Sequence, residues 1–146
     1  AILIGKKLTK ATPENIDDAI AGYGLGLDLT LRAVQSKLKE KGHPWEIAKS
    51  FDGSCPLTSF VHPSELKDDS NIEFQLKIDG ELRQHGKTSD MITAIKPLIA
   101  YISQHFTLMP GDVVLTGTPA GVGLLESGMK LEVGLESVLN VESEVL

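Results

Sequence analysis

The strongest structural signal in this 146-residue chain is a strict alternation of apolar and polar residues from Ile72 to Ile78. Successive side chains of a strand point to opposite faces, so this pattern predicts a strand with one buried and one wet face. The next two residues, Asp79 and Gly80, favour a type I′ hairpin turn, which needs two residues with positive φ. An antiparallel sheet is therefore the first element that we expect.

The other apolar patterns predict further strands and three helical stretches. Strands are expected at residues 1–5, 23–29 and 113–115, and again between 131 and 141. Helices are expected from Thr12-Pro13 to Gly22, from Leu31 to Gly42, and from Ser89 to Phe106, with a kink or restart at Pro97. Because strands dominate and the helices are not regularly interleaved with them, the expected class is α+β and not a doubly wound parallel sheet.

The composition of the chain argues against two classes of binding partner and favours a reducing compartment. The chain has 14 basic and 20 acidic residues and lacks a basic stripe, so we expect no nucleic-acid partner. No apolar run approaches the ~20 residues that cross a bilayer, so we expect no membrane partner. A single cysteine, Cys55, excludes an intrachain disulfide, and a reducing compartment is expected, either the cytoplasm or an organellar matrix.

The first residues and the lack of internal boundaries bear on the domain organisation. No repeat or linker divides the chain, so we assign residues 1–146 to a single domain. The chain opens directly on a strand-like apolar run, with no methionine and no preceding turn. We therefore expect it to be part of a longer protein.

Asp28 stands between an expected strand and an expected helix. By position alone, it either caps the helix or points into a cleft as a hard oxygen ligand. Arg32 and Gln35 follow on one helical face, and Lys49 lies farther along the chain. These residues form either a polar, cation-rich wall or a simple surface arrangement in which Arg32 pairs with Asp28. The pattern alone leaves both interpretations open.

The remaining polar motifs are less informative. The glycine-rich loop at residues 117–123 matches neither a P-loop nor a dinucleotide fingerprint, although its amides and the Thr118 hydroxyl can approach an anion closely. A structural turn is the simpler interpretation of this loop. The four scattered histidines are expected on the surface, and Cys55 is expected to be a small buried residue.

Several motifs occur in an order that is typical of one family. In the first half they are Ala21-Gly22-Tyr23, Leu27-Asp28-Leu29-Thr30-Leu31-Arg32, Gly42-His43-Pro44-Trp45, Ala48-Lys49-Ser50-Phe51-Asp52 and Ser54-Cys55-Pro56. In the second half they are Asp79-Gly80-Glu81-Leu82-Arg83-Gln84, Thr88-Ser89-Asp90-Met91-Ile92 and the run from Thr107 to Gly123. Over its whole length the chain resembles the fumarylacetoacetate hydrolase superfamily, and within it the acylpyruvase and oxaloacetate decarboxylase or tautomerase branch.

This resemblance implies a fold and a metal site. The expected fold is a strand-rich mixed β-roll, usually a homodimer, with one Mg²⁺ or Mn²⁺ between three carboxylates. Asp28 matches the third carboxylate, while the other two belong to a Glu-x-Glu segment expected immediately before Ala1. A catalytic His and Glu on a lid are expected still nearer the N-terminus of the full protein.

The resemblance also implies roles for four further residues. Gln35 and Lys49 match positions that line the substrate pocket, and the loop of Thr118 matches the one that receives the substrate carboxylate. Arg32 matches the family arginine after the metal ligand, but Ala33 replaces the aspartate that usually supports it. Lys49 is also the expected catalytic residue, because an ammonium group stabilises a developing oxyanion.

Three functions remain open at this stage. The leading one is a metal-dependent enzyme that hydrolyses, decarboxylates or tautomerises small 2-oxo acids through an enolate. A second is an isomerase or decarboxylase of unsaturated dioic acids from aromatic breakdown. The third is a binding or assembly module that keeps the fold but has an incomplete metal site.

Overall fold

The computed structural model describes residues 1–146, which form two compact units. The first unit comprises residues 1–25 and 59–146, and the second comprises residues 26–58. All named strands lie in the first unit. Strands and short helices together make an α+β fold, which confirms the expected class. The assignment of residues 1–146 to one domain stays a prediction.

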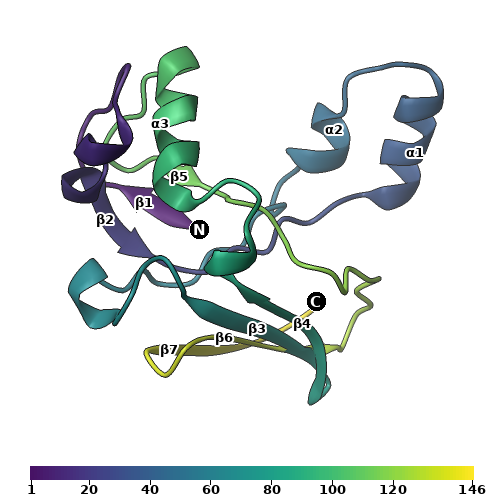
Figure 1. The fold of residues 1–146 in the computed structure, drawn as a ribbon. Coiled ribbons are helices and arrows are strands. Elements are labelled where there is room, and N and C mark those ends of the chain that lie inside the picture. The colour runs from purple at the N-terminus through teal and green to yellow at the C-terminus, as the bar shows by residue number, and fades with distance from the viewer. The chain divides into compact units, whose positions relative to one another are not determined.

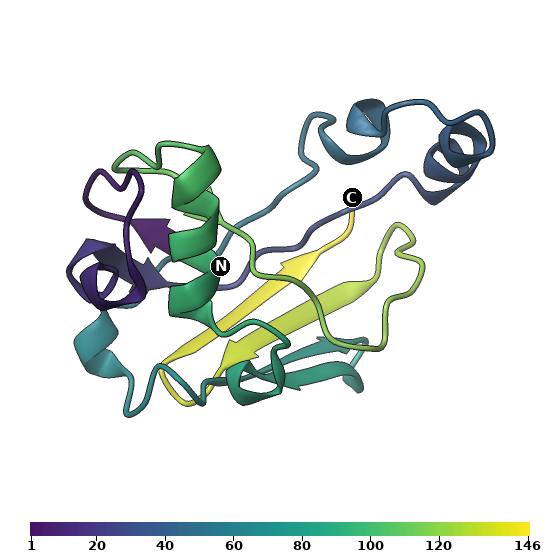
Figure 2. The ribbon, with the colours of Figure 1, turned by 45° about the horizontal axis from the view of Figure 1, so that its top comes forward.

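A small three-stranded sheet and one helix enclose the main core of the first unit. Strand β1 (Ile2–Ile4) lies between β2 (Ile20–Tyr23) and β5 (Val113–Val114), and both pairs are antiparallel. Helix α3 (Ile95–His105) lies beside this sheet (Figures 1 and 2). Its Ile99 belongs to the same buried cluster as the β1 side chains, so burial of apolar surface holds the layers together.

A four-stranded antiparallel sheet forms the rest of the first unit. Its strands are β3 (Glu73–Ile78), β4 (Glu81–Lys87), β6 (Lys130–Leu135) and β7 (Leu139–Glu144), in the order β4-β3-β6-β7. The expected hairpin is confirmed, because Asp79 and Gly80 join β3 to β4 with φ values of +51° and +81°. The expected sharp contrast between the two faces of β3 is absent: residues 74–78 are all half-buried in this central strand.

Ion pairing on this sheet affects one carboxyl group. His85 on β4 donates a hydrogen bond to the Glu73 carboxylate, and Lys87 lies opposite Glu73 in the strand register. The hydrogen bond, followed by the Lys87 charge, lowers the pKa of Glu73 below its ordinary value of 4.5. The ionised form of Glu73 therefore supports the β3–β4 pair.

Two of the expected elements differ in the structure. The helix expected at residues 12–22 is replaced by the 3₁₀ turns η1 (Pro13–Asn15) and η2 (Asp17–Ala19), followed by β2. Ile20 pairs with Ile4 in the sheet, so a contact distant in sequence overrides the local helical spacing. The strand expected at residues 23–29 is not formed, because β2 ends at Tyr23.

The other helical segments of the first unit are α3 and two further 3₁₀ turns. Helix α3 accommodates Pro97 without the expected kink, because the helix begins at Ile95 and Pro97 therefore lies in its first turn. The segment before it holds the 3₁₀ turn η4 (Thr88–Asp90), and η3 (Pro63–Glu65) precedes β3. No helix of the structure combines the length and the apolar character that crossing a membrane requires.

The second unit contains helices α1 (Arg32–Glu40) and α2 (Glu46–Lys49), which contact each other (Figure 1). Helix α1 confirms the helix expected after Leu31, although none of its residues is buried. Backbone hydrogen bonds join the segment before α1 to the segment after α2, from the N–H groups of Leu27, Leu29 and Leu31 to Pro56, Ser54 and Ala48. This ladder brings together residues that are 17 to 29 positions apart.

Candidate functional site

The closest charged pair of the second unit joins Lys49 to Asp28. The Lys49 Nζ atom lies 2.6 Å from Asp28 Oδ1, and the two side chains are 29% and 53% exposed. The pair forms because the backbone bond from Leu31 to Ala48 places the end of α2 beside the segment that carries Asp28. Both residues were expected at the site, and the structure brings them together.

Two of the interpretations of Asp28 from its position, a cap of the helix and a partner of Arg32, are wrong, while its role as an oxygen ligand stays a prediction. Asp28 does not cap α1, because the N-cap position belongs to Leu31 and no side chain caps that helix end. It does not pair with Arg32 either, because Arg32 donates to Gln35 instead. The carboxylate of Asp28 is engaged by a residue that follows it by 21 positions.

Two further oxygen atoms hold the Lys49 ammonium in place. Thr30 Oγ1 lies 2.8 Å from Lys49 Nζ, and the carbonyl oxygen of Leu29 lies 3.4 Å away. The neighbouring Ala48 is buried and fixes the short helix that ends at Lys49. A fixed ammonium at a partly exposed position can stabilise negative charge on a bound molecule without first reorganising.

Arg32 and Gln35 lie one helical turn apart on α1, as their spacing predicts. Arg32 Nη1 donates to Gln35 Oε1 at a distance of 2.8 Å. Neither side chain forms a hydrogen bond or ion pair with Asp28 or Lys49. Their expected role as substrate-binding residues stays a prediction.

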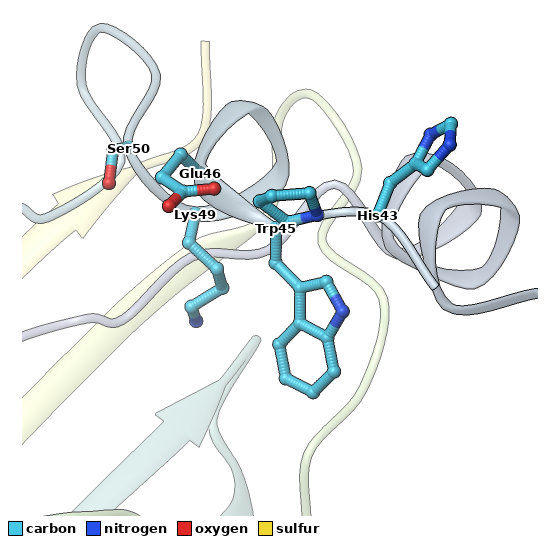
Figure 3. Close-up of a pocket in the computed structure, with 6 residues that line it drawn as sticks. His43, Trp45, Glu46, Lys49 and Ser50 are labelled. Carbon is cyan, nitrogen blue, oxygen red and sulfur yellow. The ribbon is translucent and has the colours of Figure 1, made fainter. Parts of the chain in front are cut away.

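A hollow of about 400 Å³ opens next to Lys49. It is lined by His43, Pro44, Trp45, Glu46, Lys49 and Ser50. Figure 3 shows that the side chains of Trp45 and Lys49 extend to the same side of the segment that carries them. The hollow therefore has an aromatic and a cationic lining group side by side.

Thr118 lies in the first unit, on the glycine-rich loop. Gln84 of β4 donates one hydrogen bond to Thr118 Oγ1 and one to the carbonyl oxygen of Pro119, at 2.9 and 3.1 Å. Gly121 has a φ of +100°, and a Cβ atom there would lie 1.9 Å from the carbonyl oxygen of Arg83. The loop is thus fixed against β4 at a position that only glycine fits. The expected contact of Thr118 with a substrate carboxylate stays a prediction.

The fit of a divalent cation depends on the oxygen ligands that the chain supplies. Asp28 is a partly exposed carboxylate, the ligand type that Mg²⁺ and Mn²⁺ prefer. No group of three or more His, Cys, Asp or Glu residues among residues 1–146 is arranged to hold a metal ion. These residues alone therefore do not make the expected three-carboxylate site, and Asp28 fits as a single ligand.

Other polar residues behave as surface groups. All four histidines are exposed, as expected, and His62 caps the 3₁₀ turn η3. Cys55 is exposed, so its expected burial is wrong. Thr30 and Trp45 are neighbours of Lys49 that the sequence alone did not single out as site residues. The spacing of Trp45 from Lys49, four residues across one helical turn, is the signal that indicates the second of them.

Comparison with known proteins identifies close relatives. The profile of the fumarylacetoacetate (FAA) hydrolase C-terminal family matches residues 1–146. The chain is 58% identical over 134 residues to "Oxaloacetate tautomerase YcgM" of Escherichia coli, covering 91% of this chain and 61% of that protein. It is 43% identical over 145 residues to the mitochondrial "Oxaloacetate tautomerase FAHD1" of Bos taurus, covering 99% and 66%.

A solved structure supports the same relationship. The fumarylpyruvate hydrolase from Pseudomonas aeruginosa, in complex with Mn²⁺ and pyruvate, superposes with a TM-score of 0.92 at 34% identity. The match covers 99% of this chain and 62% of that one. The chain thus spans 61% to 66% of the length of these three proteins.

Proposed function

Because the chain belongs to the fumarylacetoacetate hydrolase family, we propose that it forms part of an enzyme that acts on small 2-oxo acids, with keto–enol tautomerisation of oxaloacetate as the first candidate reaction. Two relatives at 58% and 43% identity carry the name oxaloacetate tautomerase. The hydrolase from Pseudomonas aeruginosa holds pyruvate, which is itself a 2-oxo acid. These names favour the 2-oxo acid class over the isomerisation of unsaturated dioic acids and over a module without activity.

The observation that carries the proposal is the ammonium of Lys49, 2.6 Å from Asp28 on a residue that lines the hollow. Tautomerisation of oxaloacetate moves a proton between C3 and the oxygen on C2. Negative charge develops on that oxygen when the proton leaves C3. Lys49 would stabilise this charge by donating to it the N–H that now makes the long contact to the Leu29 carbonyl oxygen, while Thr30 and Asp28 keep its ammonium in position.

A divalent metal supports the same chemistry in the proposed enzyme. When bound, Mg²⁺ or Mn²⁺ supplies a Lewis acid that favours the enolate of a chelating 2-oxo acid. Asp28 would provide one oxygen ligand to it. The two glutamates expected before Ala1 stay a prediction, and so do the substrate-binding roles of Arg32, Gln35 and Thr118.

Assembly and compartment belong to the same proposal. A homodimer is proposed from the family resemblance, without a nucleic-acid or membrane partner. The proposed compartment is the cytoplasm or an organellar matrix. The relatives include a bacterial protein and a mitochondrial one, which supports either of these compartments.

The test uses the full-length protein that contains residues 1–146, and follows the enol of oxaloacetate by its ultraviolet absorbance in the presence and absence of added Mg²⁺ or Mn²⁺. Parallel assays measure decarboxylation of oxaloacetate and hydrolysis of acetylpyruvate on the same preparation. We expect the enol to convert faster than in buffer. We expect Asp28→Asn to lower the affinity for the metal, so that a higher metal concentration is needed for the same rate. Absence of turnover in all three assays, with both metals, would contradict the proposed function.

A further inference from the structure

Trp45 is the only tryptophan of the chain, and it stands beside the proposed catalytic lysine. It directly precedes α2, and the separation of four residues places it on the same face of that turn as Lys49. The two side chains extend in the same direction, and both line the hollow (Figure 3). With 44% of its surface exposed, the indole presents a large apolar face to whatever enters.

The indole also contacts a side chain of the neighbouring helix α1. Lys39 of α1 holds its Nζ atom over the Trp45 ring, 5.2 Å from the ring centroid. A cation at this distance is attracted by the negative face of the aromatic ring. The ring is thus attached to both helices, through its own backbone next to α2 and through Lys39 on α1.

We propose that Trp45 determines how large a group a 2-oxo acid can carry beyond C3, and that Lys39 acts as its positioning residue. Lys49 attracts the oxygen that becomes negatively charged, so the rest of the bound molecule meets the adjacent indole. The hollow of about 400 Å³ is open to solvent on one side, and the indole forms one of its walls. The favoured substrates are 2-oxo acids with a short fourth-carbon group, such as a carboxylate or an acetyl group. This inference rests on the proposed function and adds the basis of substrate selection.

The first experiment compares the kcat/KM for acetylpyruvate with that for an acylpyruvate bearing a six-carbon acyl chain. Trp45→Ala removes the wall and is expected to raise the long-to-short ratio at least ~10-fold, the scale on which apolar pockets discriminate chain length. Trp45→Phe keeps an aromatic wall and is expected to keep the ratio within about threefold of the wild type. Lys39→Met frees the ring and is expected to shift the ratio in the direction of Trp45→Ala.

Lys37→Met is the matched control for the lysine variant. Lys37 lies in the same turn of α1 and is exposed, but it has no aromatic partner. Its substitution removes the same charge from the same helix without touching the indole. The ratio is therefore expected to stay at the wild-type value.

A binding measurement gives a second readout that does not depend on turnover. Because Trp45 is the sole tryptophan of residues 1–146, the part of the emission that Trp45→Phe removes reports on the hollow. Titration with pyruvate is expected to change the emission, and Trp45→Phe is expected to abolish that change. Lys39→Met is expected to alter the emission of the free protein, since the charge over the ring is lost.

The outcomes separate this inference from the proposed function. If the wild type turns over acetylpyruvate and Trp45→Ala leaves the ratio unchanged, the role of Trp45 is refuted while the proposed function stands. If Trp45→Ala does not fold, Lys39→Met decides, and an unchanged ratio and emission refute the proposal. If the wild type turns over no 2-oxo acid, the proposed function fails and this inference fails with it.

Discussion

Replacing Lys49 by methionine separates a catalytic role of its ammonium from a structural one. Methionine keeps most of the length and the apolar stem of lysine but has no charge to present to a bound molecule. Lys49 is 29% exposed and lies at the end of α2, so its side chain is not enclosed in the core. The variant therefore tests the charge more than the packing.

The structure predicts a small loss of stability. An ion pair between groups as exposed as Asp28 and Lys49 contributes ~0–1 kcal/mol to the free energy of unfolding. The hydrogen bond to Thr30 contributes about 1 kcal/mol more. Asp28 stays half-exposed after the substitution, so water can solvate its charge. We expect the unfolding free energy to fall by less than about 2 kcal/mol.

The expected loss of activity is much larger. Removal of one fixed donor to a developing oxyanion lowers kcat on the order of 10²-fold, which equals about 2.7 kcal/mol of activation free energy. The rate is measured on oxaloacetate by the disappearance of the enol absorbance. The stability is measured in parallel by urea unfolding of the same preparation.

Lys41→Met serves as the control for this variant. Lys41 follows α1 at an exposed position and takes part in no ion pair, so both quantities are expected to match the wild type. A kcat within about threefold of the wild type in Lys49→Met would refute the oxyanion role of Lys49. A loss of more than about 3 kcal/mol in unfolding free energy would instead show that Lys49 is mainly structural.

Three further predictions concern the first unit. Ser103→Ala removes a buried hydroxyl that accepts from the Ala11 N–H group, so urea unfolding is expected to show a loss of ~1–3 kcal/mol. Gly121→Ala places a Cβ against the carbonyl oxygen of Arg83 at positive φ, and a loss of at least about 2 kcal/mol is expected in the same assay, whereas wild-type stability would disprove the clash. Because the folded-state pKa of Glu73 is lowered, its ionised form stabilises the fold above pH 4.5 and this contribution is lost as the pH falls through the lowered pKa. The stability difference between wild type and Glu73→Gln is therefore expected at neutral pH and should vanish in acid, and a difference that grows in acid would contradict the assigned cause.

The elements that the sequence predicted correctly are those whose determinants are local. The hairpin follows from Asp79 and Gly80, which adopt the positive φ values that a type I′ turn needs. Helix α1 follows from apolar spacing between Leu31 and Gly42. The stretch at residues 12–22 shows the same helical spacing but forms two 3₁₀ turns and a strand. Its Ile20 pairs with Ile4, and no local pattern contains that information.

In the candidate site, too, the local features could be predicted from the sequence and the contacts between distant residues could not. Its residue types could be identified from the sequence, because Asp28 and Lys49 are polar groups beside apolar segments and match a family motif. Their mutual contact could not be predicted from spacing, since it depends on a backbone ladder that closes a loop of about twenty residues. Periodicity within one helix offered Arg32 as the partner of Asp28, but that residue turns to Gln35.

The second unit supports the charged pair and the aromatic wall by different means. The pair depends on the backbone ladder, in which the Leu31 N–H group bonds to the Ala48 carbonyl oxygen and so closes the loop independently of the α1 side chains. The position of the Trp45 ring depends on a side chain of α1, the ammonium of Lys39. Because α1 buries none of its residues, its surface can change with little effect on folding. Substitutions on this helix can therefore alter the range of accepted substrates while the ion pair, and with it the proposed chemistry, stays in place.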